Sequence, residues 1–220
     1  MKFKIKEKVK IKELNYTKSF LYTKEMQSFA SNEVGIIQSY DESDNTYEVK
    51  ILKDNYEYWF HEEDIMSLKT RGFEVINDEY RKHSDVKIQL PTRGDSRSAG
   101  YDFYSNETIV LQPKQSHLFW TDVKSFMLND EVLKIYVRSS IGVKKGLMLK
   151  NTVGIIDSSY YSNKDNDGNI GICLYNNSNK VVEIQKGERI AQGVFLKYLL
   201  ADEDETLNSE RSGGFGSTGK

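Results

Sequence analysis

The chain has 220 residues, with 31 lysines and arginines against 33 aspartates and glutamates, so its formal net charge is only −2. A charge this small creates no long-range field toward nucleic acid or a membrane surface, and we expect neither as a partner. The single cysteine, Cys173, excludes an internal disulfide framework and favours a reducing, cytoplasmic setting. No apolar run has the length of a membrane span, and the lysine-rich N-terminus lacks the hydrophobic core of a signal peptide.

The first 70 residues predict a small β domain of their own. Apolar residues alternate with lysines over 3–11, a polar turn at 40–45 precedes a second alternating run at 47–51, and an aromatic run follows at 56–60. About five short strands in so few residues resemble the small SH3-like β-barrels. We therefore expect a barrel over 1–70, and it is a possible interaction module for a protein partner.

Two interpretations of the aromatic run stay open. Trp59 with Tyr56 or Tyr58 would bind a peptide or a modified residue if these rings are exposed. They would instead fill the core if the small domain needs them for stability, and this second interpretation is favoured.

Residues 71–220 predict a second, larger β domain. Short alternating runs recur at 133–137, 170–174 and 182–184, and helix signals are weak throughout. A β-rich domain of this size is typically a sandwich or a jelly roll. The fold class expected for the whole chain is therefore mainly β.

Five stretches of this second domain are richer in functional residue types than a sandwich needs. They are SAGYDF at 98–103, YVRSSIG at 136–142, NTVGIIDSSY at 151–160, GERIAQ at 187–192 and RSGGFGSTGK at 211–220. The first and third carry carboxylates beside turns, and the second ends a strand with an arginine and two serines that suit an anion. The last offers glycine N–H groups, hydroxyls, an arginine and one ring, which together suit a phosphate and a base. A disordered glycine-rich tail is the alternative for that last stretch.

In this order and spacing the five stretches resemble the motifs of the trimeric dUTPase family, over about residues 86–220. The resemblance implies a jelly-roll subunit and a homotrimer with shared active sites. A mobile C-terminal arm (about 205–220) would close over one of these sites. It also implies hydrolysis of dUTP to dUMP and pyrophosphate, with Mg²⁺ on the triphosphate.

The resemblance also assigns roles by position. Asp157 would be the general base for the attacking water, and Asp102 would hold the metal through its waters. Arg138, Ser139, Ser140 and Gln192 would bind the α- and β-phosphates, with Gln192 also near the water. Because Gln192 shares the parity of inward-facing apolar residues, a core glutamine that caps the backbone is its alternative role.

The remaining roles concern recognition of the nucleoside and the terminal phosphate. Asn151 and the backbone around it, including Gly154, would read the uracil edge. Tyr160 would pack against the deoxyribose and exclude a 2′-hydroxyl. The residues assigned to the arm are Arg211, Gly216, Ser217 and Thr218 on the γ-phosphate and Phe215 stacked on the base.

The third stretch departs from the family pattern. Ser159 replaces the usual Asp, and about six residues, within 161–167, are inserted before Gly168. The inserted loop could fold over the site, contact a neighbouring subunit or lengthen a turn. Asp165 and Asp167 lack the ligand spacing of an EF-hand, so we do not expect calcium there.

Two other functions compete with dUTP hydrolysis. A dCTP deaminase shares this jelly roll but uses a Glu to activate its water, whereas the Asp157 motif and the arm favour triphosphate hydrolysis. A regulatory role would act through the N-terminal barrel or the 161–167 loop and is compatible with an enzyme. A composition rich in Lys, Asn and Tyr suits a low-GC bacterium or its phage.

Overall fold

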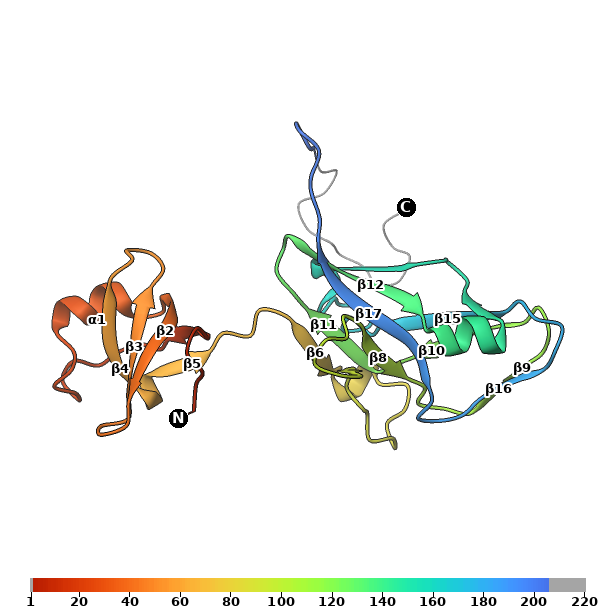
Figure 1. The fold of residues 1–220 in the computed structure, drawn as a ribbon, viewed down its shortest axis with the longest axis horizontal. Coiled ribbons are helices and arrows are strands. Elements are labelled where there is room, and N and C mark those ends of the chain that lie inside the picture. The colour runs from red at the N-terminus through yellow and green to blue at the C-terminus, as the bar shows by residue number, and fades with distance from the viewer. Residues whose placement is uncertain (1, 206–220) are drawn as a thin grey trace. The chain divides into compact units, whose positions relative to one another are not determined.

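The structure is a computed structural model, and it describes residues 2–205 (Figure 1). The chain divides into two compact units, Met1–Lys69 and Thr70–Lys220. Each unit has a hydrophobic cluster of its own. In the part of the chain that the structure describes, no helix is both long and apolar enough to cross a membrane.

The first unit is one antiparallel sheet with a short helix. Its elements are β1 (Lys8–Ile11), α1 (Lys24–Ala30), β2 (Val34–Asp41), β3 (Thr46–Ile51), β4 (Glu57–His61), η1 (Glu62–Asp64) and β5 (Ile65–Ser67). The strands lie in the order β4-β3-β2-β1-β5. No pairing joins the edge strands β4 and β5 within residues 2–69, so the sheet does not close into the predicted barrel.

The core of this unit follows the alternation of the sequence. Tyr47, Val49 and Ile51 on β3 are fully buried, because every second residue of a strand faces the same side. Within the aromatic run, Phe60 is buried in the core, while Tyr56 and Trp59 are exposed and do not fill it.

Helix α1 is an element that the sequence analysis did not predict. It begins at the N-cap Thr23, whose hydroxyl accepts a hydrogen bond from the Met26 amide at 3.1 Å. Met26 and Ala30 are both buried, four residues apart on one face. The capping threonine and this spacing were the available signals, but seven residues are too few to stand out against a β-rich background.

The second unit consists of short antiparallel strands. They are β6 (Gly72–Val75), β7 (Thr92–Arg93), β8 (Tyr101–Tyr104), β9 (Ile109–Leu111), β10 (Ser116–Trp120), β11 (Val123–Phe126), β12 (Glu131–Val137), β13 (Leu147–Leu149), β14 (Gly154–Asp157), β15 (Gly171–Asn176), β16 (Val182–Ile184) and β17 (Arg189–Lys197). The helical turns are η2 (Asp78–Tyr80), η3 (Ser140–Lys144) and η4 (Ser158–Tyr160).

Two sheets hold most of this unit together. One has five strands in the order β14-β12-β17-β8-β7, and the other has three in the order β10-β15-β13. Leu133 and Phe103 from the larger sheet join Phe119 and Ile172 from the smaller one in a single buried cluster. The chain is thus mainly β, as predicted.

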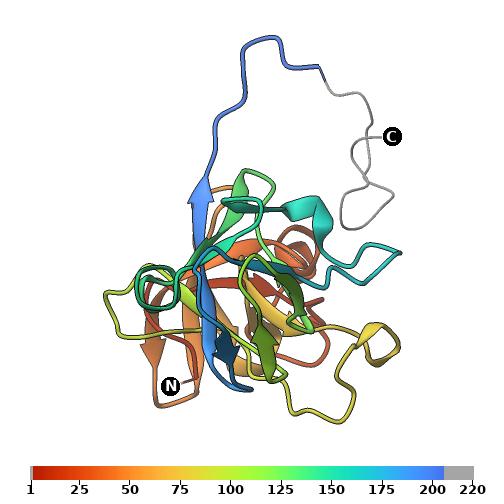
Figure 2. The same cartoon turned by 90° about the vertical axis from the view of Figure 1, so that its right-hand side faces the viewer.

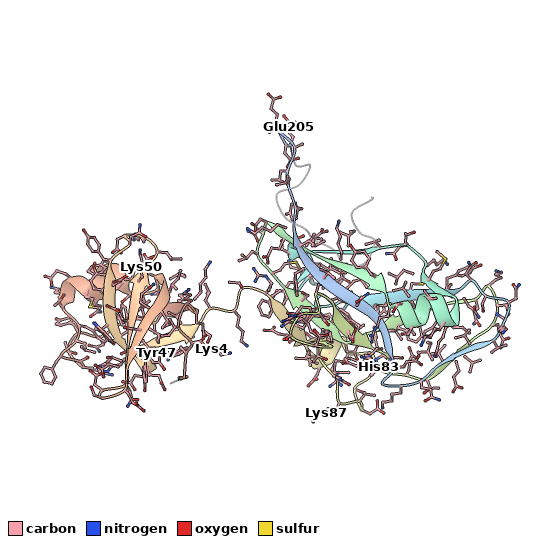
Figure 3. All side chains as sticks on the ribbon, in the orientation of Figure 1. Lys4, Tyr47, Lys50, His83, Lys87 and Glu205 are labelled. Atoms are coloured by element: carbon pink, nitrogen blue, oxygen red, sulfur yellow. The ribbon has the colours of Figure 1, made fainter. Side chains whose placement is uncertain are left out.

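After β17 the chain leaves its sheet and extends away from the body of the second unit in both views (Figures 1 and 2). Leu199 and Leu200 on this segment are largely exposed. The last described residue is Glu205 (Figure 3). Five predicted arm residues, Arg211, Phe215, Gly216, Ser217 and Thr218, lie outside the described residues.

Candidate active site

One group of predicted site residues meets on three neighbouring strands. Asp102 on β8 lies opposite Gln192 on β17, and Arg138 directly follows β12. The Asp102 carboxylate lies 3.0 Å from Arg138 Nη1 and 3.3 Å from Arg189 Nη1, through the same oxygen, Oδ2. We call Asp102, Arg138, Arg189 and Gln192 the arginine cluster. Its two guanidinium groups outweigh its one carboxylate, so the cluster favours an anion.

Arg189 is a site residue whose partner the sequence analysis did not identify. The structure shows Asp102 as its partner. The two residues are far apart in sequence and meet only because β17 pairs with β8. That pairing leaves no local trace in the sequence.

The position of Gln192 depends on the glycine that directly precedes the neighbouring strand β8. It is half-buried on β17, and a Cβ at Gly100 would lie 2.5 Å from its Oε1 atom. Any side chain at position 100 would therefore displace the amide. This close approach gives a physical reason for the glycine just before the Tyr101–Asp102 pair.

The two serines that follow Arg138 are exposed. Ser139 precedes the helical turn η3 and Ser140 begins it. The Arg138 carbonyl accepts hydrogen bonds from the Ile141 and Gly142 amides, which fixes this tight turn directly after the strand. Both hydroxyls are therefore presented beside the arginine cluster and are available to a ligand.

A second group of predicted residues lies on and after β14. Asp157 ends this strand and is exposed, while Asn151 is exposed in the turn that precedes it. Gly154 pairs with Ile135, and a Cβ there would approach Ile135 Cβ to 3.0 Å. Tyr160 follows in η4 and is buried. We call 151–160 together with the inserted loop the β14 end of the site.

The two groups lie at opposite ends of β12. Asp157 pairs with Val132 near the start of this strand, whereas Arg138 follows Val137 at its end. At roughly 3.4 Å per residue, the six steps from Val132 to Arg138 separate them by about 20 Å. One copy of the chain therefore does not bring the Asp157 carboxylate to its own arginine cluster.

An ion pair holds the start of β12 beside Asp157. Arg71 donates from Nε to both carboxylate oxygens of Glu131, each at 3.0 Å. These hydrogen bonds lower the pKa of Glu131 below its usual value, because they favour the charged carboxylate against the cost of its burial. The ion pair ties β12 to the segment that enters the second unit.

The described residues contain no group of three or more His, Cys, Asp or Glu side chains that could hold a metal ion. Asp102 is the one predicted metal residue, and two guanidinium groups already share its carboxylate. This arrangement does not fit a metal cage built by the protein. It fits Mg²⁺ that is bound mainly by substrate phosphates and water, with one carboxylate nearby.

Comparison with known proteins decides the family. The sequence profile of dUTPase matches residues 86–219. The chain belongs to the dUTPase family. The matched range covers the first four predicted stretches and all but the last residue of the fifth.

Individual dUTPases agree with this assignment. The deoxyuridine 5'-triphosphate nucleotidohydrolase of Lactococcus lactis is 46% identical over 153 residues, which are 69% of this chain and 99% of that protein. The enzyme of the same name from Debaryomyces hansenii is 36% identical over 137 residues, 60% of this chain and 81% of that protein. A crystal structure of dUTPase from Streptococcus mutans has a TM-score of 0.52 at 39% identity, over 60% of this chain and 98% of that chain.

Proposed function

We infer that this chain hydrolyses dUTP to dUMP and pyrophosphate. Membership of the dUTPase family supports the reaction, and the arginine cluster supplies positive charge for a polyanionic substrate. Mg²⁺ bound by the triphosphate would neutralise further charge on the phosphates, with Asp102 positioned near its water ligands.

In this proposal Asp157 is the general base that orients and deprotonates the water attacking the α-phosphorus in line. Its carboxylate is exposed, so a water molecule can reach it. Arg138, Ser139, Ser140 and Gln192 bind the phosphates. Asn151 and the backbone at Gly154 read the uracil, and Tyr160 packs against the deoxyribose.

In this proposal the chain forms a homotrimer with shared active sites, and one observation supports it. Asp157 and Arg138 lie about 20 Å apart along β12 in one chain, at roughly 3.4 Å per residue, which is too far for one nucleotide phosphate to contact both. If Asp157 of one copy lies beside the arginine cluster of another copy, one nucleotide can contact both. The exposed segment after β17 is suited to reach a neighbouring copy.

Subunit complementation tests the shared site. Asp157→Asn and Arg138→Ala chains are each expected to be almost inactive as homo-oligomers. When equal amounts are unfolded together and refolded, we expect about a quarter of the unsubstituted activity, because a random pairing places an intact Asp157 beside an intact Arg138 at that frequency. Pyrophosphate release from dUTP measures the outcome, and ammonia release from dCTP would instead reveal a deaminase-type reaction.

A double variant provides the control for this experiment. Mixing the Asp157→Asn, Arg138→Ala double variant with the unsubstituted chain also gives sites of mixed origin, and its activity calibrates the mixing. If the two single variants stay inactive together while this control shows full exchange of chains, both residues act within one chain and the shared-site proposal is wrong.

The first unit supports a second role, binding of a basic segment of a protein partner. It contains a cavity of about 690 Å³, a size typical of ligand pockets. Five carboxylates line it against two lysines: Glu13, Asp44, Glu62, Glu63 and Asp64 against Lys2 and Lys18. Phe20, beside the cavity-lining Ser19, is fully exposed and offers an apolar contact. The strand order β4-β3-β2-β1-β5 is compatible with an open SH3-like sheet.

A charge-neutralising variant tests this role. We expect a fluorescently labelled oligo-arginine peptide to bind the full chain saturably. An Asp44→Asn, Glu62→Gln variant should weaken this binding at least about tenfold, because opposite charges attract most strongly where solvent is partly excluded. Glu57→Gln removes an exposed carboxylate outside the cavity lining and is the matched control. Equal loss in all variants would reduce the interaction to nonspecific charge attraction.

A further inference from the structure

The hydroxyl of Tyr160 is held by the loop that follows it. Asn166 Nδ2 donates to the Tyr160 hydroxyl at 2.7 Å, and that hydroxyl donates to the Asn169 carbonyl at 2.9 Å. The residue is only 5% exposed. The hydrogen of this hydroxyl and one of its lone pairs are thus both engaged, so the direction of the ring is set by residues of the loop.

The loop is in turn folded around Tyr160 by its own amides. Asn163 is buried and donates from Nδ2 to the Tyr160 carbonyl at 2.8 Å and to Asn166 Oδ1 at 2.8 Å. The Gly168 amide also donates to Asn166 Oδ1, at 3.1 Å. Gly168 has φ of +80°, and a Cβ there would meet the Tyr160 carbonyl at 2.8 Å. Asn166 is therefore fixed on both its oxygen and its nitrogen.

A buried ion pair anchors the loop to the rest of the second unit. Lys124 Nζ on β11 lies 2.9 Å from Asp167 Oδ2, and the two side chains are 8% and 4% exposed. Asp167 Oδ2 also accepts the Asn77 amide at 2.7 Å. Tyr161 donates its hydroxyl to Glu74 at 2.7 Å. Asn77 and Glu74 precede residue 86, where the match to the dUTPase profile begins.

We propose that Asn166 is a positioning residue that sets the selectivity of this enzyme for deoxyribose over ribose. The proposal rests on the proposed function, in which Tyr160 packs against the sugar. The Tyr160 ring can exclude the 2′-hydroxyl of ribose only if the ring cannot move aside. Such exclusion weakens transition-state binding of UTP relative to dUTP. The loop supplies that rigidity through Asn166, with Asp167 as its anchor.

Substitution of Asn166 tests the proposal through the ratio of kcat/KM for dUTP to that for UTP, measured by pyrophosphate release. In Asn166→Ala we expect this ratio to fall between about threefold and tenfold, the value of one lost hydrogen bond, while kcat for dUTP changes less than about twofold. Lys164→Ala is the matched control, because Lys164 is exposed on the same loop and its hydrogen bond from the Tyr80 hydroxyl goes to the backbone carbonyl, which the substitution keeps. An unchanged ratio in a folded Asn166→Ala protein would overturn the proposal.

A double-mutant cycle separates positioning from a general loosening of the loop. Tyr160→Phe removes the anchored hydroxyl and should lower the ratio by a similar factor, and Asn166→Ala should then have no further effect in the Tyr160→Phe background. If the two substitutions instead lower the ratio independently, so that their factors multiply in the double variant, Asn166 does not act through the Tyr160 hydroxyl and the proposal is wrong. If Asn166→Ala does not fold, the isosteric Asn166→Asp, which loses the donor but keeps the acceptor, decides the same question.

The unsubstituted chain gives the outcome that separates the two proposals. Failure to release pyrophosphate from dUTP would overturn the proposed function, and this selectivity role with it. Normal hydrolysis of dUTP, with a ratio that none of the Asn166 variants changes, would overturn the selectivity role alone.

Discussion

The arginine cluster and the β14 end of the candidate active site are held together by different forces. In the arginine cluster a single buried carboxylate, Asp102, keeps two guanidinium groups close together. Around Tyr160 the contacts are mostly neutral amides, which hold a ring rather than a charge. Two like charges repel when no substrate is bound, so a site for a polyanion needs a counter-charge of its own. A surface that recognises a sugar by shape needs only rigidity.

The two ends also differ in exposure. Asp102 is almost fully buried, whereas Asp157 is exposed at the end of β14. A buried carboxylate that pairs with two guanidinium groups is suited to hold them in place. An exposed acid such as Asp157 is accessible to water, as its proposed role of general base requires. In the proposed site, the same residue type would therefore serve different purposes at the two ends of β12.

Removing the negative charge of Asp102 is expected to have a larger effect than removing that of Glu131. In Asp102→Asn we expect kcat/KM for dUTP to fall between about tenfold and a hundredfold, because Arg138 and Arg189 lose the carboxylate that orients them. The loss should grow as the salt concentration is lowered, since the uncompensated repulsion is then less screened. Steady-state kinetics at two ionic strengths measures both effects.

The control for this variant is an ion pair at the surface. Asp130 pairs with Lys197 at 2.7 Å, and both side chains are largely exposed. Asp130→Asn removes the same charge and should leave kcat/KM nearly unchanged. If Asp102→Asn behaves like Asp130→Asn, the carboxylate does not organise the arginines and the contrast between the two ends is wrong.

The sequence predicted the parts of this molecule that depend on local pattern. The alternation at 47–51 gave a buried strand, and the five stretches gave the family, because each is a short run of residue types in a fixed order. Closure of the first sheet depends instead on whether its two edge strands meet. No local sequence pattern indicates whether these two strands pair, and in the structure the sheet is open rather than a closed barrel.

The same limit applies to the site. The sequence named Asp102 and Arg138 but could not show that Arg189 shares their carboxylate, since the contact requires β17 to pair with β8. The inserted loop was identified as polar, yet its anchor on Lys124 joins residues more than forty positions apart. Contacts of this kind follow from the register of strands, which a single sequence does not reveal.

The smallest effect is expected from the ion pair that holds β12 beside Asp157. Glu131 is 5% exposed and its pKa is lowered from about 4.5 by Arg71, so its contribution to stability is present above that usual value. The contribution is lost as the pH falls through the lower pKa of the folded state. Because Arg71 is partly exposed to solvent, Glu131→Gln should reduce the free energy of unfolding by only about 1 kcal/mol at neutral pH.

Urea unfolding between about pH 7 and about pH 3 measures this effect. The difference between the unsubstituted chain and Glu131→Gln should shrink as the pH falls below the usual value for a glutamate, because the native carboxylate is then increasingly protonated. Glu183→Gln changes an exposed glutamate on β16 and should show no such trend. A difference that stays constant over the whole range would mean that Glu131 stabilises β12 by packing rather than by charge.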